Sequence, residues 1–383
     1  MNQFLDLFKQ LLKVRPFKKA EGSVLGVDIG SSSIKVVQLR KKRGAAVLET
    51  YGEISLGPYG DVGVGRATNL GADKLAEALR DVLKEASVTT KDCGVSIPFS
   101  SSLITLIEMP DLPEGQLKEM IPIEARKYIP VPIGEVSLDW FVVPEGNNKL
   151  FSGAVSKSNK ETKGSKIQVL LVAIHNETLS KYRTVLKDVG LAPTFFEIEI
   201  FSTIRAVLEQ GVQPVMIVDV GAATTKLYIV EYGIVRTSHI INRGSQNITT
   251  SLSKSTGVSE QKAEQMKREM GMLGTVSGGT EGHGVSDAAL AALDYIFSEA
   301  RRTLIGYQKK YNRNIGTVIL TGGGIILPGL LPFAQKQFET EVRHANPFSK
   351  VETPAFLEET LRSAGPEFAV SVGLALRKLH ELE

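Results

Sequence analysis

Cysteine is almost missing from this sequence. Cys93 is the only one in 383 residues, so the chain cannot form an internal disulfide or hold zinc or an iron–sulfur cluster through cysteines alone. The five histidines are scattered and show no ligand spacing such as HExxH, so the sequence gives no sign of a metal centre built on histidine. This sparing use of cysteine is typical of a reducing compartment, and we expect a cytoplasmic protein.

Long apolar runs and an excess of charge are missing as well. The uncharged stretch 317–333 is too short for a transmembrane helix and is interrupted by glycine and proline. The formal net charge is +3, and no run of like charge dominates a domain, so nothing points to nucleic acid as a partner. With 42% hydrophobic and 23% charged residues, the composition is that of a globular protein with room for two domains.

The first 20 residues carry an amphipathic pattern. Phe4, Leu7, Phe8, Leu11 and Leu12 fall on one face of a helix, and lysine and arginine flank them. The charges threaded through the segment argue against a signal peptide. Two interpretations stay open, which are a helix on a membrane surface and a short helix docked on the protein body or on a partner.

Apolar periodicity predicts an alternation of strands and helices. Strands are predicted at 24–29, 34–39, 47–55, 94–97, 103–109, 136–143, 167–174, 215–220, 226–230, 233–240 and 317–321. Helices are predicted at 73–86, 114–128, 176–189, 199–210, 244–256, 259–271, 286–311, 329–338 and 367–378. The polar residues 144–166 are typical of a long hairpin loop, and the block around them reads as an insertion into an α/β protein.

One pattern occurs twice, 191 residues apart. Residues 27–37 and 218–228 each contain an apolar strand, aspartate, an apolar residue, glycine, a turn of small residues and a second apolar strand. Asp28 and Asp219 hold the same place in the two copies. A single copy fits an ordinary hairpin turn. Two copies at near-domain spacing predict two related lobes, each with its own turn.

Small residues in these turns suit phosphate binding. Backbone N–H groups in a tight turn form a concavity for anions, and phosphate approaches the backbone only where side chains are small. Lys35 can neutralise the terminal phosphates, and Asp28 and Asp219 can hold a magnesium ion or its waters. A third motif, at Gly322, Gly323 and Gly324, follows a strand and offers flat backbone to adenine or ribose. Alone it fits an ordinary strand–helix loop.

Along the chain come the first turn, a connecting helix, the second turn and the glycine loop. This order resembles that of the superfamily of actin, sugar kinases and heat-shock chaperones. The resemblance implies an α/β, actin-like (ribonuclease H-like) two-lobed ATPase fold with a small α+β inserted subdomain in the first lobe. From residue 23 onward the sequence resembles the PilM family of type IV pilus assembly proteins. The segments that carry this resemblance are Met109–Pro113, Ile121–Ala125, Tyr128–Pro132, Asp219–Thr225 and Glu367–Arg377.

The resemblance also implies a set of site residues for ATP and Mg2+. Residues expected to bind the nucleotide are Asp28, Gly30, Ser31, Ser32, Ser33, Lys35, Asp219, Gly221, Thr224, Thr225, Glu264, Lys267, Gly322, Gly323 and Gly324. Asp28 and Asp219 are expected near Mg2+, through water. Glu199 falls where the superfamily has the residue that orients the attacking water, and a solvated helix residue is the alternative. For Glu264 and Lys267 the alternative is an exposed ion pair on a helix.

The resemblance implies a division of the chain and a departure from the superfamily. The expected parts are an amphipathic segment 1–22, a first lobe 23–98, an inserted subdomain 99–190, a connecting helix 191–212, a second lobe 213–345 and a return to the first lobe at 346–383. The division protein FtsA has aspartate where this chain has Lys226. The lost acid removes one contact to water or metal, so we expect slow ATP hydrolysis or none.

The expected function is that of a cytoplasmic ATP-binding component of type IV pilus assembly, peripheral at the inner membrane and supporting twitching motility. The resemblance implies that it binds the cytoplasmic N-terminal peptide of PilN and links the inner-membrane complex to the motor and other platform proteins. The segments 103–109 and 117–128 are candidates for that contact. One alternative is a polymerising, membrane-associated division protein like FtsA. Another is a small-molecule kinase on the same fold, although no carboxylate is marked as its catalytic acid.

Overall fold

The computed structural model describes residues 22–143, 166–209, 211, 213–273 and 281–381. The amphipathic segment and nearly all of the predicted loop at 144–166 therefore lie outside the described residues. Contacts divide the chain into two units. Among the described residues, the inserted unit lies within Ile97–Arg183, and the main unit combines residues 22–96 with the chain from Thr184. No helix in the described ranges is both long enough and apolar enough to cross a bilayer.

The first sheet of the main unit has the strand order β3-β2-β1-β4-β8. Its strands are β1 (Ser23–Ile29), β2 (Ser33–Lys42), β3 (Ala45–Ser55), β4 (Asp92–Ile97) and β8 (Ala192–Ile198). The first three strands form an antiparallel meander, and β4 joins β1 in parallel. In the β1–β2 register Asp28 lies opposite Lys35, so both side chains emerge on the same face of the sheet.

The second sheet repeats this order as β11-β10-β9-β12-β13. Its strands are β9 (Val215–Val220), β10 (Thr225–Glu231), β11 (Ile234–Ile241), β12 (Thr317–Thr321) and β13 (Glu341–His344). Again three strands form an antiparallel meander and the fourth joins in parallel. Asp219 lies opposite Lys226, as Asp28 lies opposite Lys35 in the first sheet. The sequence repeat is therefore a repeat of whole lobes.

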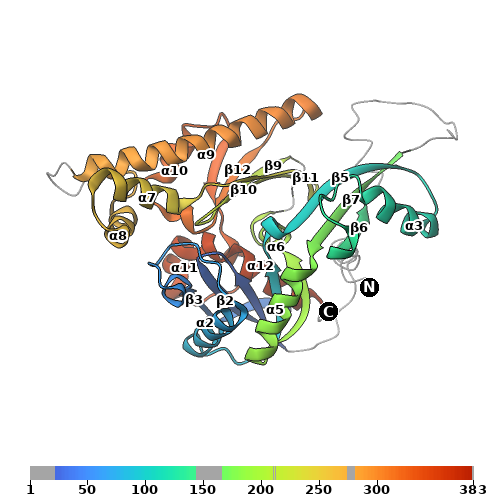
Figure 1. The fold of residues 1–383 in the computed structure, drawn as a ribbon, viewed down its shortest axis with the longest axis horizontal. Helices are drawn as coiled ribbons and strands as arrows, with labels where there is room; N and C mark the ends of the chain where they lie inside the picture. Colours follow the sequence, from blue (N-terminus) through green and yellow to red (C-terminus); the bar gives the residue numbers. More distant parts are fainter. Residues whose placement is uncertain (1–21, 144–165, 210, 212, 274–280, 382–383) are drawn as a thin grey trace. The chain divides into compact units, whose positions relative to one another are not determined.

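Helices cover both sheets of the main unit (Figure 1). They are α2 (Ala72–Glu85), α6 (Glu199–Val207), α7 (Ser245–Thr256), α8 (Glu260–Met270), α9 (Glu281–Tyr311), α10 (Leu330–Gln335), α11 (Glu358–Ala364) and α12 (Ala369–Glu381). In the second lobe α9 and α10 share an apolar core with β9, β10 and β12. In the first lobe α12 packs against β1 and α6. A Cβ atom at Gly26 would lie 1.9 Å from the Ser371 carbonyl oxygen, so this close approach requires glycine.

The inserted unit is a three-stranded antiparallel sheet with helices. Its strands, β5 (Ser102–Pro110), β6 (Val136–Val142) and β7 (Lys166–His175), pair in the order β5-β7-β6. Helix α3 (Glu114–Ala125) buries Leu117, Ile121 and Ala125 in the core of this unit. Helix α5 (Asn176–Val189) follows β7, and the division between the units falls within it.

Most elements lie where the sequence predicts them, with differences at the ends. Helix α9 begins at Glu281 instead of residue 286, and α10 is confined to Leu330–Gln335. Two strands, β8 and β13, and the short helix α11 were not predicted. Strand β8 contains a proline and two adjacent phenylalanines, so it shows no clean alternation, and β13 has only four residues.

Candidate functional site

A cavity of about 470 Å³ lies between the two lobes of the main unit. Gly30 from the first turn and Gly221 from the second both line it, so the two repeats share one cavity. With one exception, every predicted site residue lines it: Asp28, Gly30, Ser31, Ser32, Ser33, Lys35, Glu199, Asp219, Gly221, Thr224, Glu264, Lys267, Gly322, Gly323 and Gly324. The volume lies within the range of small-molecule sites.

Thr225 is the exception. Its side chain is fully buried, and its hydroxyl donates a hydrogen bond to the carbonyl oxygen of Arg243 at 2.8 Å. Side chains alternate along β10, so Thr225 lies on the face opposite Lys226, which does line the cavity. The Thr225 side chain therefore does not face this cavity, and its expected contact with the nucleotide stays a prediction.

The two turns have the same backbone geometry. The Gly30 N–H donates to the Ser33 carbonyl oxygen at 3.0 Å, and the Gly221 N–H donates to the Thr224 carbonyl oxygen at 2.9 Å. A Cβ atom at either glycine would lie 3.0–3.1 Å from the acceptor that closes its turn. Each turn thus keeps its compact form because glycine is present, and it leaves small residues facing the cavity.

Lys35 lies between two carboxylates of the first lobe. Its Nζ is 2.8 Å from Glu53 Oε1 and 3.9 Å from Glu367 Oε2, and it donates to Ser33 Oγ at 2.6 Å. Burial disfavours its ammonium, but Glu53 and Glu367 outweigh that effect and hold the pKa of Lys35 above its usual value. Burial raises the pKa of Glu367 to about 7. The sequence reading missed both glutamates, because they come from elements outside the repeated motif.

The equivalent lysine of the second lobe has different partners. Lys226 Nζ donates to Glu199 Oε2 at 2.6 Å and to Asp219 Oδ2 at 3.2 Å. The side chains of Lys226, Glu199 and Asp219 are only 15%, 11% and 8% exposed. Burial opposes the ammonium, yet Asp219 and Glu199 together raise the pKa of Lys226, which is therefore charged. Glu199 is thus a buried, paired carboxylate in the cavity wall and not a solvated helix residue.

Burial raises the pKa of Glu199, and the neighbouring charges of Asp219 and Asp28 add to this, while Lys226 opposes it.

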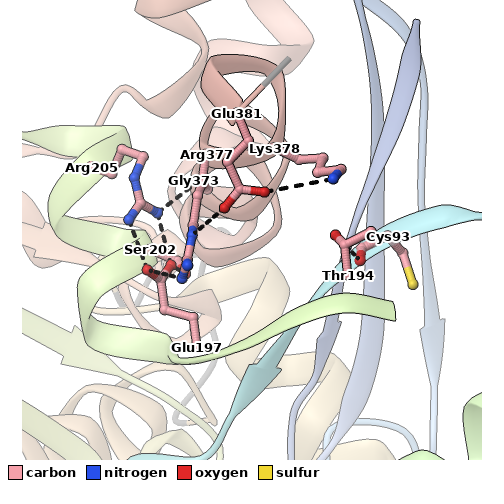
Figure 2. A network of polar contacts seen from close by, with 9 residues as sticks. All are labelled: Cys93, Thr194, Glu197, Ser202, Arg205, Gly373, Arg377, Lys378 and Glu381. Carbon is pink, nitrogen blue, oxygen red and sulfur yellow. Dashed lines mark hydrogen bonds and ion pairs between the residues drawn. The ribbon is translucent and has the colours of Figure 1, made fainter. Parts of the chain in front are cut away.

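A network of polar contacts around Glu197 anchors α6, the helix that begins at Glu199 (Figure 2). Glu197 precedes α6 and receives two hydrogen bonds from Arg205 at 2.8 Å each and one from Arg377 at 3.0 Å. This buried network joins α6 to α12 and so fixes the start of α6, where Glu199 lies.

The two expected magnesium ligands already have partners. Ser96 Oγ donates to Asp28 Oδ1 at 2.6 Å, and Asp219 contacts Lys226. The described part of the chain contains no cluster of three or more acids, histidines or cysteines able to hold a metal. Mg2+ in proteins commonly binds one or two carboxylates, waters and substrate phosphates. Asp28 and Asp219 face one cavity from opposite lobes and offer two carboxylates. They fit that donor set only when a phosphate supplies the remaining oxygen ligands.

The glycine loop forms the wall beside Asp219. Gly322 has φ 88°, and a Cβ atom there would lie 2.4 Å from Asp219 Oδ1 and 2.5 Å from the Val220 carbonyl oxygen. Gly322 therefore combines a left-handed backbone with a close approach, which only glycine tolerates. The loop continues as a short 3-10 helix, Gly323–Ile326, whose first two residues line the cavity.

Glu264 and Lys267 form a buried ion pair in the second lobe. Lys267 Nζ is 2.6 Å from Glu264 Oε2, and both side chains are less than 10% exposed. Thr249 Oγ1 donates to the same carboxylate at 2.6 Å, and Arg268 contacts its other oxygen at 2.7 Å. The pair therefore lies in the cavity wall, and the alternative of an exposed helix pair is wrong.

A loop of the first lobe reaches the helices of the second. Arg66 Nη1 donates to Thr250 Oγ1 at 2.8 Å and lies 3.3 Å from Glu260 Oε1. The Ala67 N–H donates to Gln246 Oε1 at 3.1 Å, and Gly65 lies against Glu264. Val64 and Gly65 line the cavity. This strap, residues 63–67, therefore connects the lobes at the rim of the cavity.

Two lobes of like topology, each contributing a glycine turn to one cavity, define the actin-like ATPase fold. The chain belongs to the family of type IV pilus assembly protein PilM, whose model matches residues 26–379.

Three known proteins illustrate the similarity. A chain of the PilM–PilN type IV pilus biogenesis complex is 24% identical, with a TM-score of 0.75 over 94% of this chain and 98% of that one. MreB5 of Spiroplasma citri bound to ADP shares the fold at 10% identity and a TM-score of 0.50, over 94% of this chain and 97% of that one. Cell division protein FtsA of Neisseria meningitidis is 28% identical over 42% of this chain, which covers only 41% of FtsA.

Proposed function

We propose that this protein is the ATP-binding, actin-like component of a type IV pilus assembly machine, working in the cytoplasm at the inner membrane. The observation that carries the proposal is the pair of matched turns at Gly30 and Gly221, which open onto one cavity. The ADP bound by MreB5, which has the same fold, supports a nucleotide in that cavity. Family membership supports the place in pilus assembly.

In this proposal the phosphates lie between the two turns. Backbone N–H groups and the hydroxyls of Ser31 and Ser32 donate to them, and Lys35 supplies positive charge. The adenosine lies against Gly322, Gly323 and Gly324, with Glu264 and Lys267 beside it. Asp28 and Asp219 are the residues that would hold Mg2+, through water. The metal would neutralise phosphate charge.

ATP binding is tested by filling the cavity without removing a charge. Gly323 has an ordinary φ, and a Cβ atom there meets only the flexible end of Glu367, at 3.3 Å. Gly323→Leu should therefore fold and weaken binding of a fluorescent ATP analogue by about 100-fold, because the side chain occupies nucleotide space. Gly306→Leu is the matched control, since Gly306 is exposed on α9 with open space around it. Equal affinity in both variants would contradict the site.

The partner in this proposal is the cytoplasmic N-terminal peptide of PilN. The PilM–PilN complex supports it, as does an apolar surface on the inserted unit. On and just after α3, Met120, Ile123 and Tyr128 are 42–63% exposed, while the opposite face of α3 is buried in its own core. Exposed apolar side chains grouped on one helix are typical of a docking surface. Through this contact the protein would link the inner-membrane complex to the motor.

The partner assignment is tested by titrating the full-length protein with a labelled PilN N-terminal peptide. Ile123→Asp should weaken binding by about tenfold or more, because a charge would be desolvated on an apolar surface when the peptide binds. Ile305→Asp is the matched control, since Ile305 is also an isoleucine exposed on a helix, α9, in the main unit. If wild type binds and both variants bind equally well, α3 is not the contact. If wild type does not bind, PilN is not the partner.

The partial match to FtsA supports one alternative, a polymerising membrane-associated division protein. Polymerisation would be seen as sedimentation of the protein with ATP but not with ADP, at concentrations where it is otherwise dispersed. A protein that stays in the supernatant with both nucleotides would remove this alternative and leave the pilus function standing.

A further inference from the structure

The ion pair between Lys226 and Glu199 has no counterpart among the described residues of the first lobe. Both lysines lie opposite an aspartate in the same hairpin register. Lys35 is held by Glu53 and Glu367, which lie on the first lobe beside its own turn. Lys226 instead reaches out of its hairpin to the first residue of α6, in the element that connects the lobes. The lysine of the repeat therefore makes an additional contact in the second lobe, with α6.

We propose that Lys226 is a positioning residue that restrains Glu199, so that the cleft keeps ATP bound instead of hydrolysing it. The proposal rests on the proposed ATP site. In the proposed ATP complex Glu199 is the one acid from the connecting helix that lines the cavity, and its Oε2 is 2.6 Å from an ammonium. A carboxylate oxygen committed to an ammonium at this distance presents less negative charge and fewer lone pairs to a water molecule.

The surroundings favour a persistent pair. Glu199 is fixed at the start of α6 by the Glu197 network, and Lys226 is held at its other side by Asp219 at 3.2 Å. Lys226, Glu199 and Asp219 are all nearly buried, so water screens their attraction only weakly. Lys226 cannot leave without exposing two buried carboxylates to each other, which is strongly unfavourable.

The reaction that the pair suppresses is simple hydrolysis. A water oxygen bonds to the γ-phosphorus, and the bond from that phosphorus to the β–γ bridging oxygen breaks. ADP leaves with the electron pair of the broken bond, and the proton of the water passes through Glu199 to the inorganic phosphate. Glu199 has to accept a hydrogen bond from the water for this step. An ammonium on the same carboxylate competes for that position.

The test removes the charge of Lys226 and keeps its length. Lys226→Met and Lys226→Gln, measured in single-turnover ATP hydrolysis, should each be about tenfold faster than wild type, which is the low end of what a positioned acid–base residue contributes. ATP affinity should stay within about threefold, because the phosphates keep Lys35 and both turns. Lys226→Arg keeps the charge and should keep the slow rate. The second mutation Glu199→Gln should abolish the gain of Lys226→Met.

Lys74→Met is the matched control, because Lys74 is an exposed lysine on α2 that pairs with Glu77. It should leave both the rate and the affinity unchanged. Neutral variants that bind ATP without faster hydrolysis would overturn the proposal, and so would a gain that survives Glu199→Gln. Failure of both neutral variants to fold would give the pair a structural role and overturn it too. A wild-type protein that does not bind ATP would instead refute the proposed function.

Discussion

Replacing Glu197 with glutamine should cost the protein a large part of its stability. Glu197 is fully buried, and its carboxylate receives hydrogen bonds from Arg205, Arg377 and Ser202 (Figure 2). Arg377 is itself only 3% exposed and also stacks over Phe195, with its guanidinium carbon 3.9 Å from the ring centroid. The neutral side chain has the same size, so the change removes charge without opening a cavity.

The magnitude follows from the two arginines left behind. Removing one partner of a buried ion pair costs about 3–5 kcal/mol, because the remaining charge loses its carboxylate and stays out of water. Arg377 keeps its contact with Glu381 and Arg205 keeps the Gly373 carbonyl oxygen, but both lose the fully buried carboxylate that they share. At about 2 °C per kcal/mol for a chain of this size, Glu197→Gln should lower the melting temperature by about 6–10 °C. The control is Glu358→Gln, whose pair with Arg362 is 68% and 74% exposed and should be worth less than about 1 kcal/mol.

The same network predicts the direction of a pH effect. Burial opposes ionisation of Glu197, but Arg205 and Arg377 outweigh it and hold its pKa below the usual carboxyl value. A group with a lowered native pKa stabilises the fold above its unfolded pKa and loses that contribution as pH falls through its native pKa. Thermal melts from pH 7 to pH 3 should therefore show a smaller loss of stability in Glu197→Gln than in wild type. If the variant melts within 2 °C of wild type at pH 7, on the same scale of about 2 °C per kcal/mol, the reasoning about uncompensated charge is refuted.

Three further predictions follow from the cavity and its sheet. Arg66→Ala should speed release of a fluorescent ATP analogue about threefold in stopped flow by cutting the strap, whereas Arg40→Ala, with its ion pair inside the first lobe, should not. Since the pKa of Glu367 is about 7, its carboxyl group becomes negatively charged above that pH, beside Lys35. ATP affinity should therefore fall about threefold from pH 6 to pH 8. This fall should vanish in Glu367→Gln. Burial raises the pKa of Cys93 to about 12, so a thiol reagent at pH 8 should label it only in denaturant, and rapid labelling of native protein would contradict this.

The repeat could be predicted from the sequence because the residues that form each turn are close together in the chain. A strand, an aspartate, a glycine and small residues lie within a dozen positions, and period and residue type alone predict a hairpin with an open turn. Two such hairpins at near-domain spacing predict two related lobes, and the resemblance to the actin superfamily implies that both turns serve one nucleotide. Gly30 and Gly221 do line one cavity, and the equal strand orders of the two sheets extend the repeat beyond the motif.

The partners of the charged residues could not be predicted, because they come from distant positions. Lys226 meets Glu199 from 27 residues away, and Glu197 meets Arg377 from 180 residues away. Contacts between residues so far apart in the sequence produce no pattern in its periodicity or composition. The sequence also left Glu264 and Lys267 open between a contact with the nucleotide and an exposed ion pair, since an i, i+3 spacing does not show whether the helix face is buried.

The same hairpin motif places a lysine in the cleft twice, and the two lysines have different partners. The register places Lys35 and Lys226 identically, so the difference between them lies in what the rest of the chain brings near. Glu53 and Glu367 of the first lobe surround Lys35, which in the proposed ATP complex supplies positive charge to a phosphate. Lys226 instead pairs with the first residue of α6, so a movement of α6 away from the second lobe acts directly on that ion pair. A partner that shifts α6 would therefore change the fate of ATP without touching it, and its effect should disappear in Lys226→Met.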